Sequence, residues 1–172
     1  LSIDQGTTST RSILFDLNGK PFFISQKEFK QYFPKDGWVE HNPEEIWKTT
    51  KIVLKNALLK IKKIKGEILT LGITNQRETT IIWDKQTGKS IYNAIVWQDR
   101  RTSDLCDSLK KKGLQKIIKS KTGLILDPYF SATKIKWILE NVPKAKNLLK
   151  KNRLLFGTMD TYLVWKLTGG KI

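Results

Sequence analysis

The sequence has 172 residues, of which 39% are hydrophobic and 28% are charged, and it carries a formal net charge of +16. This composition is typical of a globular protein and excludes a disordered tail, a collagen-like repeat and a small disulfide-linked scaffold. No apolar run is long enough to span a membrane, so no stable membrane insertion is expected. The single cysteine, Cys106, cannot form an internal disulfide, and no cysteine and histidine cluster could hold zinc. This cysteine usage predicts a reducing, cytoplasmic location.

The positive charge comes mainly from lysines, which are distributed over several segments such as residues 60–65, 110–112 and 144–151. Proteins that bind nucleic acids tend to concentrate charge on one face and to use arginine for bidentate contacts. Dispersed lysines are more typical of solvated helix surfaces. We therefore expect no nucleic-acid partner.

The two ends of the sequence predict a fragment of a longer protein. The chain begins at Leu1 rather than at a methionine, and Leu1 already has the character of a mid-strand residue. The last residues, 169–172, contain no closing helix or tail.

The first third of the chain predicts three antiparallel strands followed by a helix. The strands are expected at residues 1–4, 12–15 and 22–29, with a tight turn at Asn18-Gly19. The helix is expected from Pro43, because Asn42 is a favourable N-cap and proline fits the first helical position.

The remaining elements alternate between strands and helices. Residues 68–74 form a continuous apolar run that predicts a buried strand, and residues 79–84 predict another. Helices are expected at residues 102–112, 114–120, 131–141, from 143 onward, and 158–167. Leading strands followed by alternation with helices indicate an α/β domain.

The segment from Asp4 to Arg11 is a candidate phosphate-binding turn. Its residues between the first two strands are Gln5-Gly6-Thr7-Thr8-Ser9. Successive backbone N–H groups in such a turn can bind an anion, and Gly6 permits close approach of a ligand. The hydroxyls and the Arg11 guanidinium add donors for phosphate oxygens, and Asp4 could hold Mg²⁺. An ordinary β-turn remains the alternative.

Three further segments could surround a small polar ligand. Residues 75–78 (Asn-Gln-Arg-Glu) follow the predicted strand 68–74, where they could line a cleft and offer donors and acceptors to a polyol. Trp97 could supply an apolar wall, and Tyr129 follows Pro128 in a fixed loop. The alternatives are a surface loop for 75–78 and ordinary packing for the two aromatic residues.

Several other residues suggest structural roles. Gly88-Lys89-Ser90 resembles the end of a P-loop, but Trp83 stands where that motif requires glycine, so a hairpin turn is expected. His41, the only histidine, is interpreted as a structural loop residue, and Cys106 as a buried, unreactive thiol. Asp160 is expected to cap a helix.

Six segments, taken in chain order, together resemble the FGGY family of carbohydrate kinases. They are residues 3–9 (IDQGTTS), 37–41 (GWVEH), 72–80 (GITNQRETT), 94–98 (AIVWQ), 127–131 (DPYFS) and 157–161 (GTMDT). The Arg-Glu pair after Asn-Gln and the Asp-Pro-Tyr-Phe segment resemble the members that phosphorylate glycerol more than those that act on pentuloses or gluconate.

The resemblance implies a fold, an activity and a set of site residues. The implied fold has two actin-like (ribonuclease H-like) ATPase domains around a cleft, and residues 1–172 correspond to the first part of the N-terminal domain. The implied activity is ATP-dependent phosphorylation of glycerol to sn-glycerol 3-phosphate, with ATP and Mg²⁺ as cofactors and a homo-oligomer when full length. The implied phosphate contacts are Thr7, Thr8, Ser9 and Arg11, the implied glycerol contacts are Arg77, Glu78, Trp97 and Tyr129, and Asp4 is expected near the metal.

One expected component has no counterpart in this sequence. The family's catalytic aspartate would lie beyond Ile172, so no residue of this chain is assigned as catalytic and the chain alone is expected to be inactive. The alternatives are a family member acting on another small polyol or sugar, and a non-enzymatic basic binding protein.

Overall fold

The computed structural model describes residues 1–171, and its largest sheet has four strands in the order β3-β2-β1-β5. Strands β1 (Ser2–Gln5), β2 (Ser9–Phe15) and β3 (Pro21–Glu28) are consecutive and antiparallel, as predicted. Strand β5 (Gly72–Asn75) pairs with β1 in parallel, so that both strands end at the same edge of the sheet. This parallel pair places the segments after Gln5 and after Asn75 side by side.

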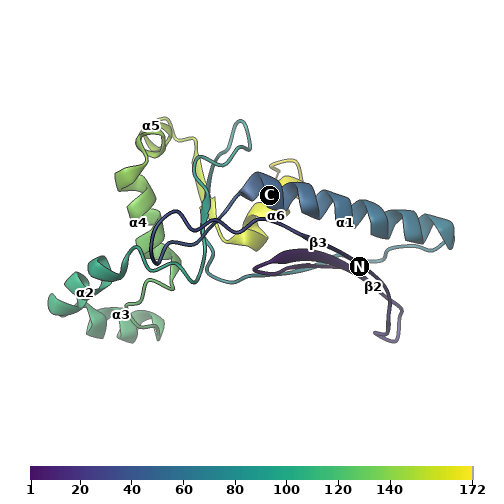
Figure 1. The fold of residues 1–172 in the computed structure, drawn as a ribbon, viewed down its shortest axis with the longest axis horizontal. Helices are drawn as coiled ribbons and strands as arrows, with labels where there is room; N and C mark the ends of the chain where they lie inside the picture. The colour runs from purple at the N-terminus through teal and green to yellow at the C-terminus, as the bar shows by residue number, and fades with distance from the viewer. Residues whose placement is uncertain (172) are drawn as a thin grey trace.

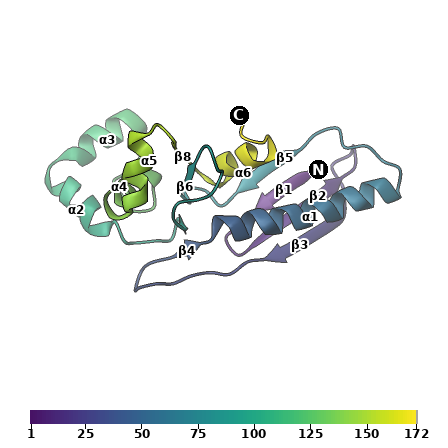
Figure 2. The same cartoon turned by 90° about the horizontal axis from the view of Figure 1, so that it is seen from above.

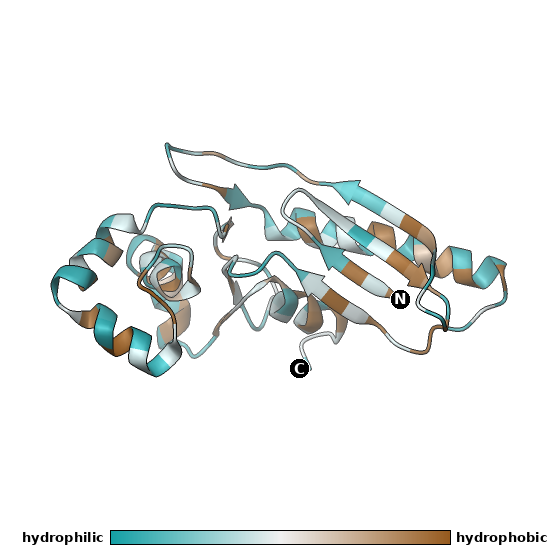
Figure 3. Ribbon diagram, turned by 90° about the horizontal axis from the view of Figure 1, so that it is seen from below, coloured by the Kyte–Doolittle hydropathy of each residue, from teal (hydrophilic) through white to brown (hydrophobic). Residues whose placement is uncertain are grey.

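A long helix, α1 (Pro43–Lys63), lies against this sheet (Figure 1). The Asn42 side chain accepts a hydrogen bond from the Glu44 backbone N–H at 2.9 Å, which confirms the predicted N-cap. Apolar residues recur along its buried face, including Ile46 and Val53. Figure 3 shows hydrophobic and hydrophilic bands following one another along the helix.

Two small antiparallel sheets connect the large sheet to the second half of the chain. One joins β4 (Glu40–His41) to β7 (Ala94–Ile95), and the other joins β6 (Ile81–Asp84) to β8 (Leu154–Gly157). All four residues of β6 are buried. Because strand side chains alternate between faces, Trp83 packs in one hydrophobic cluster and Ile82 in the other.

Most of the second half is helical, and four helices gather at the end of the molecule away from the large sheet (Figures 1 and 2). They are α2 (Ser103–Lys111), α3 (Leu114–Thr122), α4 (Ser131–Asn141) and α5 (Pro143–Lys150). The last helix, α6 (Met159–Leu167), packs against β5 and β8. No helix within residues 1–171 combines the length and the apolar character that a membrane span needs.

The prediction of a buried strand at residues 68–74 was wrong in both its limits and its burial. The strand begins only at Gly72, and Leu69 and Leu71 are 72% and 41% exposed. The physical reason is that β5 is an edge strand, which pairs with β1 on one side alone within the described residues. A continuous apolar run therefore indicated a strand correctly but overstated its coverage.

Candidate functional site

The predicted phosphate-binding turn connects β1 to β2 and stands at the edge where β1 and β5 end. It is closed by a hydrogen bond from the Gly6 N–H to the Ser9 carbonyl at 2.9 Å. Thr8 is exposed and Thr7 is half-buried, so that both hydroxyl-bearing side chains are accessible. The parallel pairing of Gln5 with Asn75 brings the segment that follows Asn75 next to this turn.

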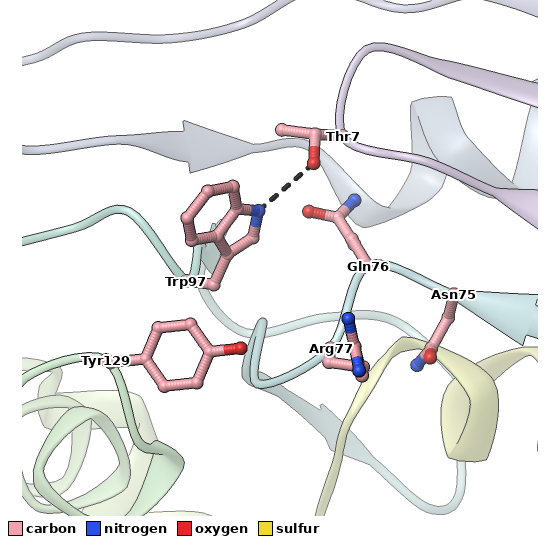
Figure 4. A pocket seen from close by; sticks show the side chains of 6 residues that line it. All are labelled: Thr7, Asn75, Gln76, Arg77, Trp97 and Tyr129. Atoms are coloured by element: carbon pink, nitrogen blue, oxygen red, sulfur yellow. Dashed lines mark hydrogen bonds between the residues drawn. The ribbon is translucent and has the colours of Figure 1, made fainter.

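Trp97 links the turn to a distant part of the chain. Its indole Nε1–H donates a hydrogen bond to the Thr7 hydroxyl oxygen at 3.0 Å (Figure 4), and its backbone N–H donates to the Thr79 hydroxyl at 3.2 Å. The ring of Tyr129 lies edge-on to Trp97, with the ring centres 6.1 Å apart. Thr7, which was predicted to bind phosphate, therefore lies next to Trp97 and Tyr129, which were predicted to bind a polyol.

These residues surround a cavity of about 310 Å³. Its lining residues are Thr7, Asn75, Gln76, Arg77, Trp97 and Tyr129. A smaller neighbouring cavity, of about 130 Å³, is lined by Asn75, Arg77, Glu78, Thr158 and Asp160. Arg77 and Asn75 border both cavities, whereas Tyr129 lines only the first and Glu78 only the second.

The remaining predicted site residues lie outside these two cavities. Ser9 is buried within β2, and its hydroxyl accepts a hydrogen bond from the Gln26 amide at 3.1 Å. Arg11 pairs across the sheet with Asp4, and its Nε lies 3.5 Å from an Asp4 carboxylate oxygen. Of the predicted phosphate contacts, only Thr7 lines the larger cavity directly.

Asp4 could supply one carboxylate ligand to a magnesium ion, with the other ligands coming from elsewhere. Within residues 1–171 no group of three or more histidine, cysteine, aspartate or glutamate side chains is placed to hold a metal. Mg²⁺ is commonly held by one or two carboxylates together with substrate phosphates and water. A single half-exposed carboxylate beside the turn is compatible with that mode, with Asp4 as the protein ligand and the phosphates as the others.

His41 was expected in a loop, but it lies in β4 and is completely buried between two glutamines. Its Nε2 lies 2.8 Å from the Gln31 side-chain oxygen, and its Nδ1 lies 3.2 Å from the Gln76 side-chain nitrogen. This pattern assigns a neutral imidazole that donates from Nε2 and accepts at Nδ1. Burial accordingly lowers the pKa of His41 from 6.5 to about 4.

The two glutamines carry the His41 contacts onward to the phosphate-binding turn. The Gln31 amide donates to the Thr7 carbonyl at 2.7 Å, and the Gln76 amide lies 3.2 Å from the Gly6 carbonyl. The Gln76 side-chain oxygen accepts from the Thr79 hydroxyl at 2.9 Å. A continuous hydrogen-bond network therefore fixes the turn relative to the segment that precedes Arg77.

A buried ion cluster connects the segment that contains Trp97 with the segment that contains His41. The guanidinium of Arg101 is fully buried and lies 2.8 Å from both the Glu40 and the Asp99 carboxylates. It also stacks over the ring of Trp38, 3.8 Å from its centre. Asp99 in turn accepts a hydrogen bond from the Val39 N–H at 2.7 Å, one residue before β4 begins.

Of the other residues predicted to be structural, Cys106 and Gly88 behave as expected and Asp160 does not. Cys106 is buried, and burial raises the pKa of its thiol. Gly88 has a φ of +65° in the turn after β6, which confirms a turn rather than a P-loop. Asp160 was expected to cap this helix, but the N-cap of α6 is Thr158, and Asp160 lies within the first turn without capping a backbone N–H. Its carboxylate instead accepts from the Thr158 hydroxyl and from the Asn75 amide, the latter at 2.9 Å, which holds the end of β5 in place.

Comparisons with known proteins agree on the family and the fold. A family model described as the N-terminal domain of the FGGY family of carbohydrate kinases matches residues 1–172. A glycerol kinase of Petrotoga mobilis is 59% identical over 172 residues, and one of Rhizobium meliloti is 60% identical over 171; the matches cover 100% and 99% of this chain. The chain spans 34% of the length of each of these relatives.

Solved structures give the same fold. The crystal structure of Plasmodium falciparum glycerol kinase with ADP matches with a TM-score of 0.92 and 39% identity, over 98% of this chain and 34% of that one. A gluconate kinase from Lactobacillus acidophilus has a TM-score of 0.80 at 24% identity, over 95% of this chain and 32% of that one, a likeness that concerns the fold alone.

Proposed function

Because this chain belongs to the FGGY family of carbohydrate kinases, whose N-terminal domain it matches, we propose that the whole protein transfers a phosphoryl group from ATP to glycerol and forms sn-glycerol 3-phosphate. The observation that carries the proposal is the identity of 59% and 60%, over essentially every residue of the chain, to proteins named glycerol kinase. The cavity that joins the turn to Arg77, Trp97 and Tyr129 supports it, because a three-carbon polyol needs several donors and one apolar wall.

The phosphates of ATP are assigned to the turn between β1 and β2. The Thr7 and Thr8 hydroxyls and the turn's backbone N–H groups are suitable donors for phosphate oxygens. Ser9 and Arg11 are proposed to act from the flanking strand, Arg11 through its charge. Magnesium bound at Asp4 would supply charge neutralisation for the phosphates.

The polyol is assigned to the part of this cavity lined by Arg77, Trp97 and Tyr129, next to the smaller cavity that Glu78 lines. Arg77 donates to its hydroxyls, Glu78 accepts from them, and the Tyr129 hydroxyl can do either. The Trp97 ring, which borders the cavity, would lie against the carbon skeleton. Together these contacts would hold one hydroxyl toward the turn, and such orientation can contribute roughly 7–11 kcal/mol of the barrier reduction in a two-substrate reaction.

The proton acceptor for that hydroxyl is proposed to come from outside residues 1–172. No aspartate or glutamate lines the larger cavity in the part of the chain that the structure describes. We therefore expect the 172-residue chain, assayed alone, to show no turnover of ATP with glycerol, while the whole protein is active. Measurable turnover by the purified chain would place the base among the residues described above.

Replacing Arg77 with alanine is expected to raise the KM for glycerol by about tenfold to a hundredfold, because hydrogen bonds to charged groups contribute about 1.5–3 kcal/mol. The KM for ATP should change little. A coupled assay of ADP formation with varied glycerol measures both constants. The control is Lys119→Ala in the exposed helix α3, which should match the wild-type protein. Unchanged glycerol dependence in the Arg77 variant would contradict the assigned site.

A further inference from the structure

Lys134, on α4, is a lysine that the proposed mechanism leaves unused and that is completely buried. Buried lysines are rare, because removing an ammonium group from water costs free energy unless its hydrogens find partners. The Lys134 ammonium donates to the Tyr129 carbonyl at 2.6 Å and to the Glu78 carbonyl at 3.2 Å. Its partners are thus the backbone carbonyls of two of the residues that are assigned to the polyol.

The backbone at Glu78 needs such support. Its φ is +63°, in the left-handed region that residues with a side chain adopt at a cost in free energy. Besides the ammonium of Lys134, the Ser131 hydroxyl donates to the same carbonyl at 3.2 Å. The first turn of α4 therefore holds Glu78 in a conformation that a free loop would seldom adopt.

The electrostatic surroundings keep this ammonium charged at neutral pH. Burial lowers the pKa of Lys134 to about 8, and the opposing effect of Asp99, Glu78 and Asp127 prevents a larger fall. A charged donor makes stronger hydrogen bonds than a neutral one. The charged ammonium of Lys134 therefore connects the backbones of Glu78 and Tyr129, although these two residues lie in different segments of the chain.

We propose that Lys134 is a positioning residue for the polyol, which sets the Glu78 carboxylate and the Tyr129 hydroxyl at a fixed separation by binding both of their carbonyls. The proposal rests on the proposed function, since it assigns Lys134 to the same polyol site. Figure 4 shows the Tyr129 hydroxyl pointing toward Arg77, so a shift of the Tyr129 backbone would move that hydroxyl within the cavity.

The variant Lys134→Met tests this role, because methionine fills a similar volume but cannot donate hydrogen bonds. We expect the KM for glycerol to rise by about tenfold or more, since the Tyr129 carbonyl loses its donor and the Glu78 carbonyl loses its charged donor, while the KM for ATP stays within about twofold. The matched control is Lys136→Met on the same helix, whose side chain is 52% exposed and pairs only with Glu140; it should behave as the wild-type protein.

A purely structural role predicts a different result. If Lys134 only supported the core, Lys134→Met would lower the amount of folded enzyme and leave both KM values unchanged, which would overturn the proposal. If this variant does not fold, Lys134→Gln replaces it, because a shorter, uncharged amide weakens the contacts with both carbonyls and still offers N–H donors to the interior. An unchanged glycerol KM in that variant would then overturn the proposal, and a rise of about threefold would support it.

Measuring the wild-type protein in the same assay distinguishes a failure of the proposed function from a failure of the role of Lys134. Absence of glycerol phosphorylation by the wild-type protein would overturn the proposed function, and the role of Lys134 with it. Normal wild-type turnover together with an unchanged glycerol KM in a folded Lys134→Met protein would overturn the role of Lys134 alone.

Discussion

Replacing Arg101 with methionine is expected to lower the free energy of unfolding by about 3–5 kcal/mol, the range for breaking a buried ion pair by removing one partner. The side chains of Glu40 and Asp99 are 4% and 1% exposed, and both would remain in the interior without their guanidinium partner. The stacking of Arg101 on Trp38 would also be lost. Chemical denaturation followed by tryptophan fluorescence measures the change.

The neighbouring Arg100 provides a matched control for this prediction. Its side chain is 55% exposed and pairs with Asp127 at 3.1 Å, so Arg100→Met should cost at most about 1 kcal/mol. A third variant, Arg101→Met combined with Asp99→Asn, should regain part of the loss because one uncompensated buried charge is removed. Equal effects of Arg100→Met and Arg101→Met would contradict a stabilising role for the buried cluster.

The sequence predicted best those elements whose signals are local. Helix α1 begins at Pro43 because its cap and its proline are adjacent in sequence, and α4 matches its expected range of residues 131–141. Strands β4 and β7 were missed because each has only two residues, too few to show alternation. They exist through long-range pairing, with Glu40 opposite Ile95.

For the site, the sequence identified part of the set of residues that meet, but not what holds them. Thr7, Arg77, Trp97 and Tyr129 were named from motifs and line one cavity. His41 was expected to be structural, which is confirmed, but its position in a buried strand between Gln31 and Gln76 was not predicted. The burial of Lys134 was missed because lysine is usually a surface residue.

Their partners also come from distant parts of the chain. Gln76 is 35 residues from His41, and Glu78 is 56 residues from Lys134. The one available signal was the helical spacing that places Lys134 on the same face of α4 as the buried Ile138.

Acid is expected to destabilise the protein through His41 as the pH falls from about 6.5 toward 4. Burial lowers the pKa of His41 to about 4 in the folded state, whereas the unfolded state has the ordinary value of 6.5. Between these values the unfolded state binds more protons, so the free energy of unfolding decreases as the pH decreases. The loss amounts to about 3 kcal/mol over the whole interval, and above about pH 6.5 both states are neutral and the effect vanishes.

The hydrogen-bond geometry gives the same result independently of the pKa. A protonated imidazole donates from both nitrogens, but its Nδ1 faces the amide nitrogen of Gln76, which is itself a donor. Turning the Gln76 amide over would present an oxygen to His41, yet it would deprive the Thr79 hydroxyl of its acceptor and the Gly6 carbonyl of its donor. Protonation of His41 therefore disturbs the turn assigned to the phosphates.

The variant His41→Gln isolates this contribution, because a glutamine can donate and accept but does not titrate. As the pH falls from about 7.5 to about 4.5, the free energy of unfolding of the wild-type protein should decrease by about 2–3 kcal/mol more than that of the variant. Unfolding curves of both proteins at a series of pH values measure this difference, and all other titrating groups cancel in it. If the free energies of unfolding of the two proteins change equally with pH, His41 accepts a proton without cost in the folded state. That result would contradict the assignment of a neutral His41 between Gln31 and Gln76.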